Sequence, residues 1–254
     1  MIDFLKLRRI QGKQYIEDDR KQILSKSFRG FPLIGTLKCP EGCSECVKVC
    51  EASAVTGGIC SIDLGKCTLC GDCSFVCPQN KIVFSNGHHL ATDSREKLII
   101  TEGSTYENWE AEAVKVRNEI KNVFGRSFKL RSVSAGGCNG CELEFNACSN
   151  VNFDMGRFGI EFVASPRHAD AVVISGPLSE NMAFALEETY NAIPEPKFII
   201  AAGACAISGG IFAEGTLDRS FFDNHKVDLY IPGCPVHPLT FVNALLDFTR
   251  GKQD

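Results

Sequence analysis

The cysteines constrain this chain most, because nine of its fourteen cysteines fall within residues 39–77. The other five are spread over residues 138–234. Disulfide scaffolds are usually short and secreted, whereas this chain has 254 residues and 44% hydrophobic residues, and we expect no signal peptide at its N-terminus. Tight cysteine spacing in such a chain favours metal ligands over disulfides. The change in cysteine density also predicts two domains.

The stretch CTLCGDCSFVCP at residues 67–78 has the spacing C-x2-C-x2-C-x3-C-P. In this spacing three close cysteines bind one iron–sulfur cube and the fourth cysteine binds another. Zinc sites do not normally need a third cysteine two residues further on. An earlier copy, CPEGCSECVKVCE at residues 39–51, makes the region an internal repeat.

Together the two copies resemble the bacterial ferredoxin that carries two 4Fe-4S clusters. The resemblance implies that the first cluster is bound by Cys39, Cys43, Cys46 and Cys77. It implies that the second cluster is bound by Cys67, Cys70, Cys73 and Cys50. The copy departs from the ferredoxin pattern at two points, since one extra residue separates Cys39 from Cys43 and Glu51 replaces the usual proline. Cys60 lies outside the repeat, and we expect it to be a small buried hydrophobic residue.

From residue 128 onward the pattern alternates between apolar strands and helices, which predicts a parallel α/β sheet. In such sheets ligands collect at the carboxyl ends of the strands. Cys138, Cys205 and Cys234 each follow a predicted strand, so we expect them at one edge of the sheet. The predicted strands are 129–134, 170–176, 197–203 and 227–233, and the predicted helices are 179–190 and 238–249.

With Cys141, these cysteines supply four soft ligands, which suit a 4Fe-4S cluster or zinc. Ligands spread over three strand-end loops argue against a zinc ribbon, which uses two close knuckles. A thioredoxin-like interpretation of Cys138 and Cys141 would leave Cys205 and Cys234 without a role. Cys148 is expected to be a core thiol rather than a ligand.

Four stretches of this region resemble the small subunit of group 4 membrane-bound NiFe hydrogenases, of the energy-converting or formate hydrogenlyase type. They are also similar to the homologous 20-kDa subunit of complex I. The resemblance covers roughly residues 128–250 and is carried by GGCNGCELE, RFGIEFVASPRHADAVVISGPLSENM, PKFIIAAGACAISGGIF and VDLYIPGCPVHPLTFVNALL.

The resemblance implies a flavodoxin-like C-terminal domain whose third 4Fe-4S cluster binds Cys138, Cys141, Cys205 and Cys234. It implies an electron relay from a ferredoxin-, formate- or CO-linked donor to nickel and iron on a partner large subunit. Complex I subunits have two adjacent cysteines where this chain has C-N-G-C, which favours the hydrogenase branch. A complex I-like dehydrogenase that reduces quinone, and a scaffold with structural zinc sites, are the alternatives.

Further partners implied are membrane subunits and a donor such as ferredoxin or a dehydrogenase subunit. We therefore expect a cytoplasmic chain held on the cytoplasmic face of a membrane through its partners. The net charge of −4 indicates no nucleic-acid partner. Glu142 is a candidate for proton transfer, and the alternative is that it caps a helix or forms an ion pair. His168 is a candidate for redox-coupled protonation, and the alternative is a structural role.

The expected boundaries are an N-terminal extension (1–36), a ferredoxin-like α+β domain (37–92), a linker (93–127) and the α/β domain (128–254). The linker is expected to form one helix between a capping box at Ser104 and Glu107 and a stop at Gly125. Its apolar stripe would be Trp109, Ala113, Val116, Ile120 and Val123. His88, His89, Arg8, Arg9 and Lys13 are expected to face solvent.

Overall fold

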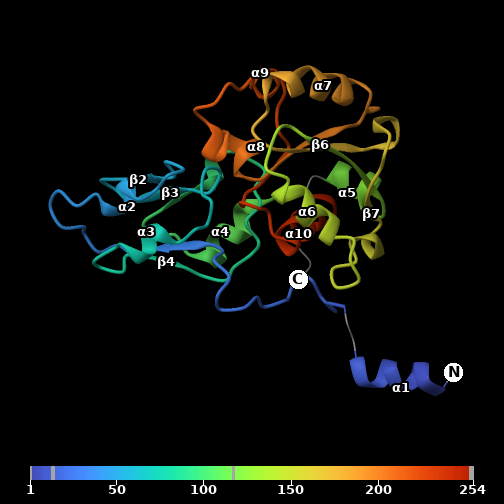
Figure 1. The fold of residues 1–254 in the computed structure, drawn as a ribbon, viewed down its shortest axis with the longest axis horizontal. Coiled ribbons are helices and arrows are strands. Elements are labelled where there is room, and N and C mark those ends of the chain that lie inside the picture. The colour runs from blue at the N-terminus through green and yellow to red at the C-terminus, as the bar shows by residue number, and fades with distance from the viewer. Residues whose placement is uncertain (1, 13–14, 116–117, 252–254) are drawn as a thin grey trace.

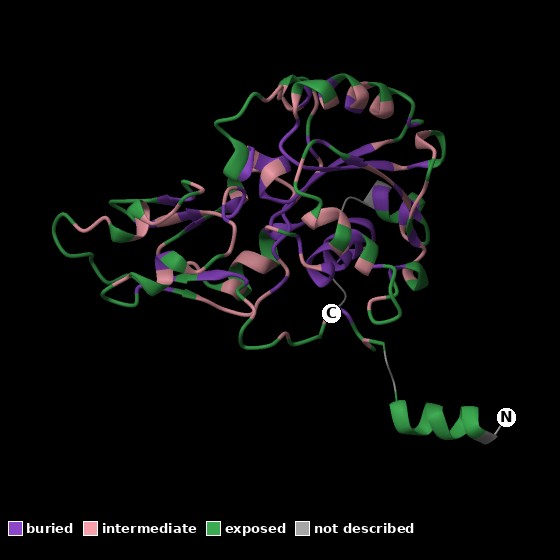
Figure 2. Cartoon of the chain, viewed as in Figure 1, coloured by how far each residue is buried: buried purple, intermediate pink, exposed green. Residues whose placement is uncertain are grey.

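The computed structural model describes residues 2–12, 15–115 and 118–251. A small lobe holding the cysteine repeat lies beside a larger α/β domain (Figure 1). Helix α1 (Ile2–Gln11) projects from this body and is exposed from Asp3 to Gln11 (Figure 2). Arg8 and Arg9 are exposed on α1 as expected, while Lys13 lies outside the described residues.

The small lobe is built from two antiparallel sheets and two four-residue helices. Each helix lies inside one copy of the cysteine repeat. The sheets are β1 (Pro32–Ile34) with β4 (Ile82–Phe84), and β2 (Val55–Thr56) with β3 (Ser61–Asp63) and β5 (Ile99–Thr101); the helices are α2 (Glu45–Lys48) and α3 (Asp72–Phe75). Because β1 and β5 pair with strands of this lobe, it extends beyond the predicted range 37–92 on both sides.

The larger domain is a five-stranded parallel sheet in the order β10-β9-β8-β6-β7. Counted from its first strand, this is the flavodoxin-like order 2-1-3-4-5, so the predicted fold class is confirmed. The four predicted strands are present, and the short edge strand β7 is an addition to them. The strands are β6 (Phe128–Ser134), β7 (Ile160–Phe162), β8 (Ala171–Ser175), β9 (Phe198–Ala202) and β10 (Leu229–Ile231).

Helices follow the strands of this domain, and both predicted helices are present. The last helix, α10, is buried along nearly its whole length and packs against α5 and α6. The α-helices are α6 (Gly140–Ala147), α7 (Glu180–Asn191), α8 (Ala204–Ser208), α9 (Ser220–Asn224) and α10 (Pro238–Arg250). Short 3-10 helices span Glu96–Leu98, Met155–Phe158, Pro166–His168 and Gly210–Phe212.

The prediction of one linker helix is wrong, because the segment forms α4 (Tyr106–Ala113) and α5 (Asn118–Phe124). Val114 is extended and ends α4. The cap is Thr105 rather than Ser104, since the Thr105 side chain accepts a hydrogen bond from the Asn108 N–H. Val116 of the predicted apolar stripe lies outside the described residues.

The two lobes share one continuous core. Ile62 and Leu64 of the small lobe belong to the same buried cluster as Ile199 and Ile207 of the large domain. A pair of backbone hydrogen bonds between Thr92 and Tyr230, of 2.9 and 2.8 Å, adds the end of the small lobe to strand β10. The relative position of the lobes is therefore fixed by apolar packing and by backbone pairing.

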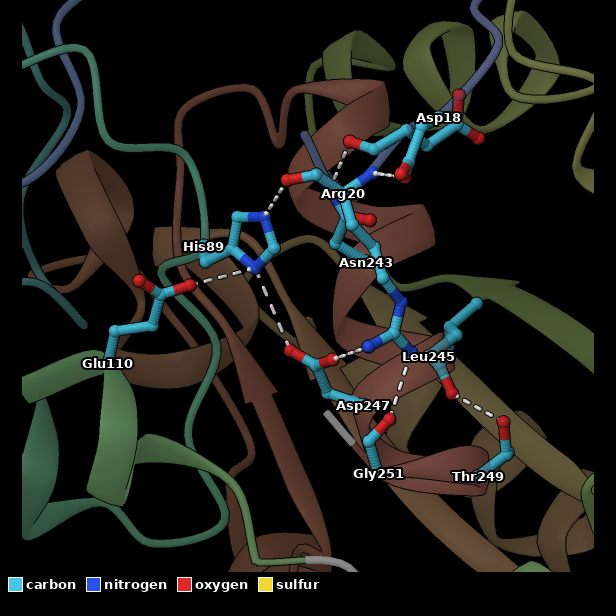
Figure 3. Close-up of polar contacts among 10 residues, drawn as sticks. Asp18, Arg20, His89, Glu110, Asn243, Leu245, Asp247, Thr249 and Gly251 are labelled. Carbon is cyan, nitrogen blue, oxygen red and sulfur yellow. Dashed lines mark hydrogen bonds and ion pairs between the residues drawn. The ribbon is translucent and has the colours of Figure 1, made fainter. Parts of the chain in front are cut away.

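A buried polar cluster adds the N-terminal segment to this junction (Figure 3). Arg20 pairs with Asp247 of α10 at 3.1 Å, and His89 Nδ1 lies 3.2 Å from Glu110 and 3.7 Å from Asp247. The prediction that His88 and His89 face solvent is wrong, because His88 is 5% exposed and the His89 side chain 13%. The physical reason is coverage by α10 and the N-terminal segment, which are distant from both histidines in the sequence.

Within the described residues, no helix is long and apolar enough to cross a membrane.

The buried His88 predicts an acid-sensitive fold. Burial lowers the pKa of His88 to about 4, and its Nε2 atom has no hydrogen-bond partner. Between pH 6.5 and 4 the unfolded chain binds a proton that the folded chain does not, so stability falls as the pH falls through this window, by on the order of 3 kcal/mol. In urea unfolding, His88→Gln should flatten this dependence.

His168→Gln is the matched control, because His168 is exposed and its loss should leave the pH dependence unchanged. Equal pH dependence in the wild-type protein and in His88→Gln would contradict the assignment.

Candidate metal centres

The loops at the carboxyl edge of the large sheet gather four cysteines. Cys138 follows β6, Cys141 lies in the first turn of α6, Cys205 lies in α8 after β9, and Cys234 follows β10. Burial is the main cause that raises the pKa of Cys141 to about 12, and the neighbouring Cys205 and Cys234 raise it further. Burial is also the main cause that raises the pKa of Cys205 to about 11, and the neighbouring Cys234 and Cys138 contribute to the rise. The four sulfurs are therefore electrostatic neighbours at one site.

Two glycines lie so close to these sulfurs that a side chain at either position would collide with them. A Cβ atom on Gly203 would lie 2.8 Å from Cys141 Sγ, and one on Gly210 would lie 3.0 Å from Cys205 Sγ. Both glycines have positive φ, of 92° and 56°, which other residues rarely adopt. The loops thus hold backbone close to the sulfurs where a side chain would collide with them.

A second set of four cysteines lies in the small lobe and combines both copies of the repeat. Burial raises the pKa of Cys67 and of Cys73 to about 12, with contributions from the neighbouring Cys50 and Cys70. The Ala54 N–H donates to Cys50 Sγ at 3.2 Å, and the Leu69 N–H donates to Cys67 Sγ at 3.4 Å.

The first set of the ferredoxin resemblance lies around an open cavity of about 660 Å³. Cys39, Cys43 and Cys46 line this cavity, and Cys39 is exposed. Burial raises the pKa of Cys46, and the neighbouring Cys77 and Cys39 add to the effect. Cys77 Sγ accepts a hydrogen bond from the Lys81 N–H at 3.3 Å.

Cys60 is buried, as expected, but it also lines the cavity of the first set. Burial raises its pKa to about 12, and Cys46 contributes to the rise. Sequence reasoning missed this fourth thiol in the cavity lining, because Cys60 lies outside the repeat spacing. Cys148 is fully buried, and its thiol donates to the Glu144 carbonyl at 3.2 Å, which confirms it as a core residue.

The donor chemistry of the three sets fits iron–sulfur clusters. Each set offers four cysteines, and backbone N–H groups donate to Cys50, Cys67 and Cys77 as they do to cluster thiolates. Cluster binding requires thiolates, so the raised pKa values mean that assembly must release protons. Among the described residues, no group of three His, Cys, Asp or Glu side chains is placed to hold a single metal ion.

A cavity at the lobe junction is lined by residues that lie near the second set and near the strand-end set in the sequence. This cavity of about 300 Å³ is lined by Glu51 and Lys66, which neighbour Cys50 and Cys67, and by Ser208 and Gly210, which follow Cys205. The cavity of the first set is lined only by residues of the small lobe. The second set and the strand-end set therefore both have neighbouring residues in one cavity, whereas the cavity of the first set belongs to the small lobe alone.

The two candidate proton carriers differ in their placement. Burial opposes ionisation of Glu142, but hydrogen bonds from Ser134 and Ser175 outweigh it and keep its pKa below the ordinary value. The Ser175 hydroxyl donates to Glu142 Oε1 at 2.6 Å. His168 is exposed and precedes β8, so it lies at the amino edge of the sheet, away from Cys205 and the other strand-end cysteines.

Comparison with known proteins places this chain in a family. Residues 138–248 match the model of the NADH ubiquinone oxidoreductase 20 kDa subunit. An uncharacterized protein of Methanocaldococcus jannaschii is 41% identical over 128 residues, which are 50% of this chain and 86% of that protein. The chain belongs to the NADH ubiquinone oxidoreductase 20 kDa subunit family.

Two further relatives lie in different kinds of complex. The probable membrane-bound hydrogenase subunit mbhJ of Pyrococcus furiosus is 36% identical, over 50% of this chain and 77% of that protein. An NADH-quinone oxidoreductase subunit of Desulfovibrio desulfuricans is 33% identical, over 62% of this chain and 85% of that protein. The family therefore includes subunits of hydrogenases and of quinone reductases.

The ligand assignment at the sheet edge predicts a selective loss of iron. With one cluster bound at each of the three sets, Cys205→Ala should remove the cluster at the sheet edge, so that iron and acid-labile sulfide each fall by about a third. Cys148→Ala is the matched control, because this thiol is buried in the core and should leave the iron content intact. An unchanged iron content in Cys205→Ala would contradict the assignment.

Proposed function

We propose that this chain is an electron-transfer subunit of a NiFe hydrogenase complex, relaying electrons through three 4Fe-4S clusters to a metal site on a partner large subunit. The observation that carries the proposal is that both lobes hold sets of four cysteines and that residues near Cys50, Cys67 and Cys205 line one cavity at the lobe junction. The set in the α/β domain would bind the last cluster, through Cys138, Cys141, Cys205 and Cys234. The small lobe would bind the other two, through Cys39, Cys43, Cys46 and Cys77, and through Cys50, Cys67, Cys70 and Cys73.

Each cluster, when bound, supplies a one-electron carrier whose potential depends on hydrogen bonds, charge and exposure around its sulfurs. The chain's own residues set those conditions. Backbone N–H groups at Ala54, Leu69 and Lys81 donate to sulfurs and favour the more negative, reduced state. The shared core holds the donor lobe beside the acceptor loops, which keeps the effective concentration of donor at the acceptor high.

The hydrogenase is favoured over the complex I-like alternative by the C-N-G-C spacing at Cys138 and Cys141. The relatives named as a hydrogenase subunit and as quinone oxidoreductase subunits support the broader class of electron-transfer subunit. In this proposal the chain is cytoplasmic and reaches the membrane through partner subunits. A ferredoxin or a dehydrogenase subunit would donate electrons to the small lobe.

The composition of the native complex tests the proposed function. The complex purified anaerobically through a tag on this chain should contain nickel and should evolve hydrogen from reduced viologen. A complex that lacks nickel and reduces quinone would replace the hydrogenase with the complex I-like alternative. Zinc in place of iron would exclude both.

A proton-transfer role for Glu142 predicts a loss of turnover without a loss of clusters. Glu142→Gln keeps the shape of the side chain but removes its basic carboxylate, so turnover should fall by roughly 100-fold. Glu144→Gln, two residues further along α6, is the matched control and should turn over normally. Equal rates for the two variants would show that Glu142 has only a structural role.

A further inference from the structure

We infer that Lys81, held by Glu102, is a positioning residue that fixes Cys39 and raises the reduction potential of the first cluster. The inference rests on the proposed function, because it assumes that Cys39 and Cys77 are ligands of that cluster. The ferredoxin spacing does not point to Lys81, which lies four residues after Cys77 and carries no sulfur.

Lys81 contacts the first set at two points. Its backbone N–H donates to Cys77 Sγ at 3.3 Å, and its side-chain ammonium lies 3.8 Å from Cys39 Sγ as a donor. Cys39 and Cys77 come from opposite ends of the cysteine repeat. One residue thus contacts the two sulfurs that are most distant in sequence within this set.

The ammonium of Lys81 is buried, and its partner is fixed. The Lys81 side chain is only 2% exposed, and its Nζ atom lies 2.6 Å from Glu102 Oε1. The same Glu102 oxygen accepts a hydrogen bond from the Cys60 N–H at 2.9 Å. Glu102 directly follows β5 and Lys81 directly precedes β4, so the pair joins the two sheets of the small lobe.

A positive charge at this position stabilises a thiolate and the more negative, reduced state of a cluster. Burial keeps water from screening the charge, so the effect is larger than for a surface lysine. Among the described residues, no lysine or arginine side chain donates to a sulfur of the second set, where the donors are the backbone N–H groups of Ala54 and Leu69. The surroundings of the first cluster therefore differ from those of the second by the positive charge of Lys81.

The contact also accounts for the departure in the cysteine spacing. The extra residue between Cys39 and Cys43 lengthens the loop, and Cys39 is exposed. An exposed thiol on a longer loop needs a contact to hold it at the cluster. The buried Lys81 supplies that contact from the far side of the cavity.

The test is an EPR-monitored redox titration of the whole chain with its clusters, with the first-cluster signal identified by its loss in Cys46→Ala. Lys81→Met should shift the potential of that signal in the negative direction, because a positive charge is lost. Glu102→Gln should shift it in the positive direction, because the opposing negative charge is lost. Lys81→Arg should stay close to wild type, since the charge is kept.

The matched control is Lys48→Met, because Lys48 forms the same kind of pair with Glu45 at 3.1 Å on the surface near Cys46. Its side chain is 67% exposed, so the potential should change little. Loss of the first-cluster signal in Lys81→Met but not in Lys81→Arg would also support the inference. Unchanged potentials, or shifts of the same sign in Lys81→Met and Glu102→Gln, would overturn it.

Two outcomes distinguish this inference from the proposed function. If the wild-type protein gives no first-cluster signal, the proposed set of three clusters fails. If the signal is present and the Glu102→Gln potential equals the wild-type value, only the role of Lys81 and Glu102 fails. Should Lys81→Met not fold, the sign of the Glu102→Gln shift decides the question by itself.

Discussion

The burial of thiols is the constraint on which the rest of this structure depends. Removing a thiolate from water is costly, and here burial raises the pKa of Cys67, Cys73 and Cys141 to about 12. Such sulfurs become stable ligands only when iron replaces their protons. The Leu69 N–H, which donates to Cys67 Sγ, offsets part of this cost. The backbone N–H groups that donate to Cys50 and Cys67 stabilise the charge of a thiolate at these sites.

The junction between the lobes gives the sulfur sites a fixed relation to one another. Electron transfer falls steeply with distance, so a relay needs its sites held at constant separation. Ile62 and Ile207 belong to one core across the junction, and the Thr92–Tyr230 pairing adds backbone hydrogen bonds to it. The ion pair of Arg20 with Asp247 holds the N-terminal segment against α10. Two separate proteins would have to achieve the same geometry by binding.

Local spacing in the sequence predicts one part of this structure. Apolar runs indicate the buried strands of the large sheet, and Cys138, Cys205 and Cys234 are expected together because parallel strands end at one edge. The break at Val114 is not predictable in this way, because the apolar spacing continues through it. The contacts at the break are long-range: the Asp93 N–H donates to the Ala113 carbonyl, and the Lys115 N–H donates to Asp93 Oδ2. The short edge strand β7 has too few residues for a period to appear.

Long-range contacts explain the remaining differences between prediction and structure. His88 and His89 look like solvent-facing residues of a linker, and only the covering segment around Arg20 and α10 buries them. Cys60 lines the cavity of the first cysteine set although it lies outside the repeat spacing. The Lys81 ammonium donates to Cys39 Sγ, which is 42 residues away in the sequence. Motif spacing indicates the ligands of a site, but it does not indicate the charges that the fold places beside them.

The count and type of clusters in the anaerobically purified wild-type chain test the central claim most directly. Mössbauer spectroscopy of iron-57-labelled protein, combined with sulfide analysis, should show about twelve iron and twelve sulfide per chain, with all the iron in 4Fe-4S form. A colourless protein, a zinc-filled protein or a preparation holding a single cluster would contradict the three-site relay.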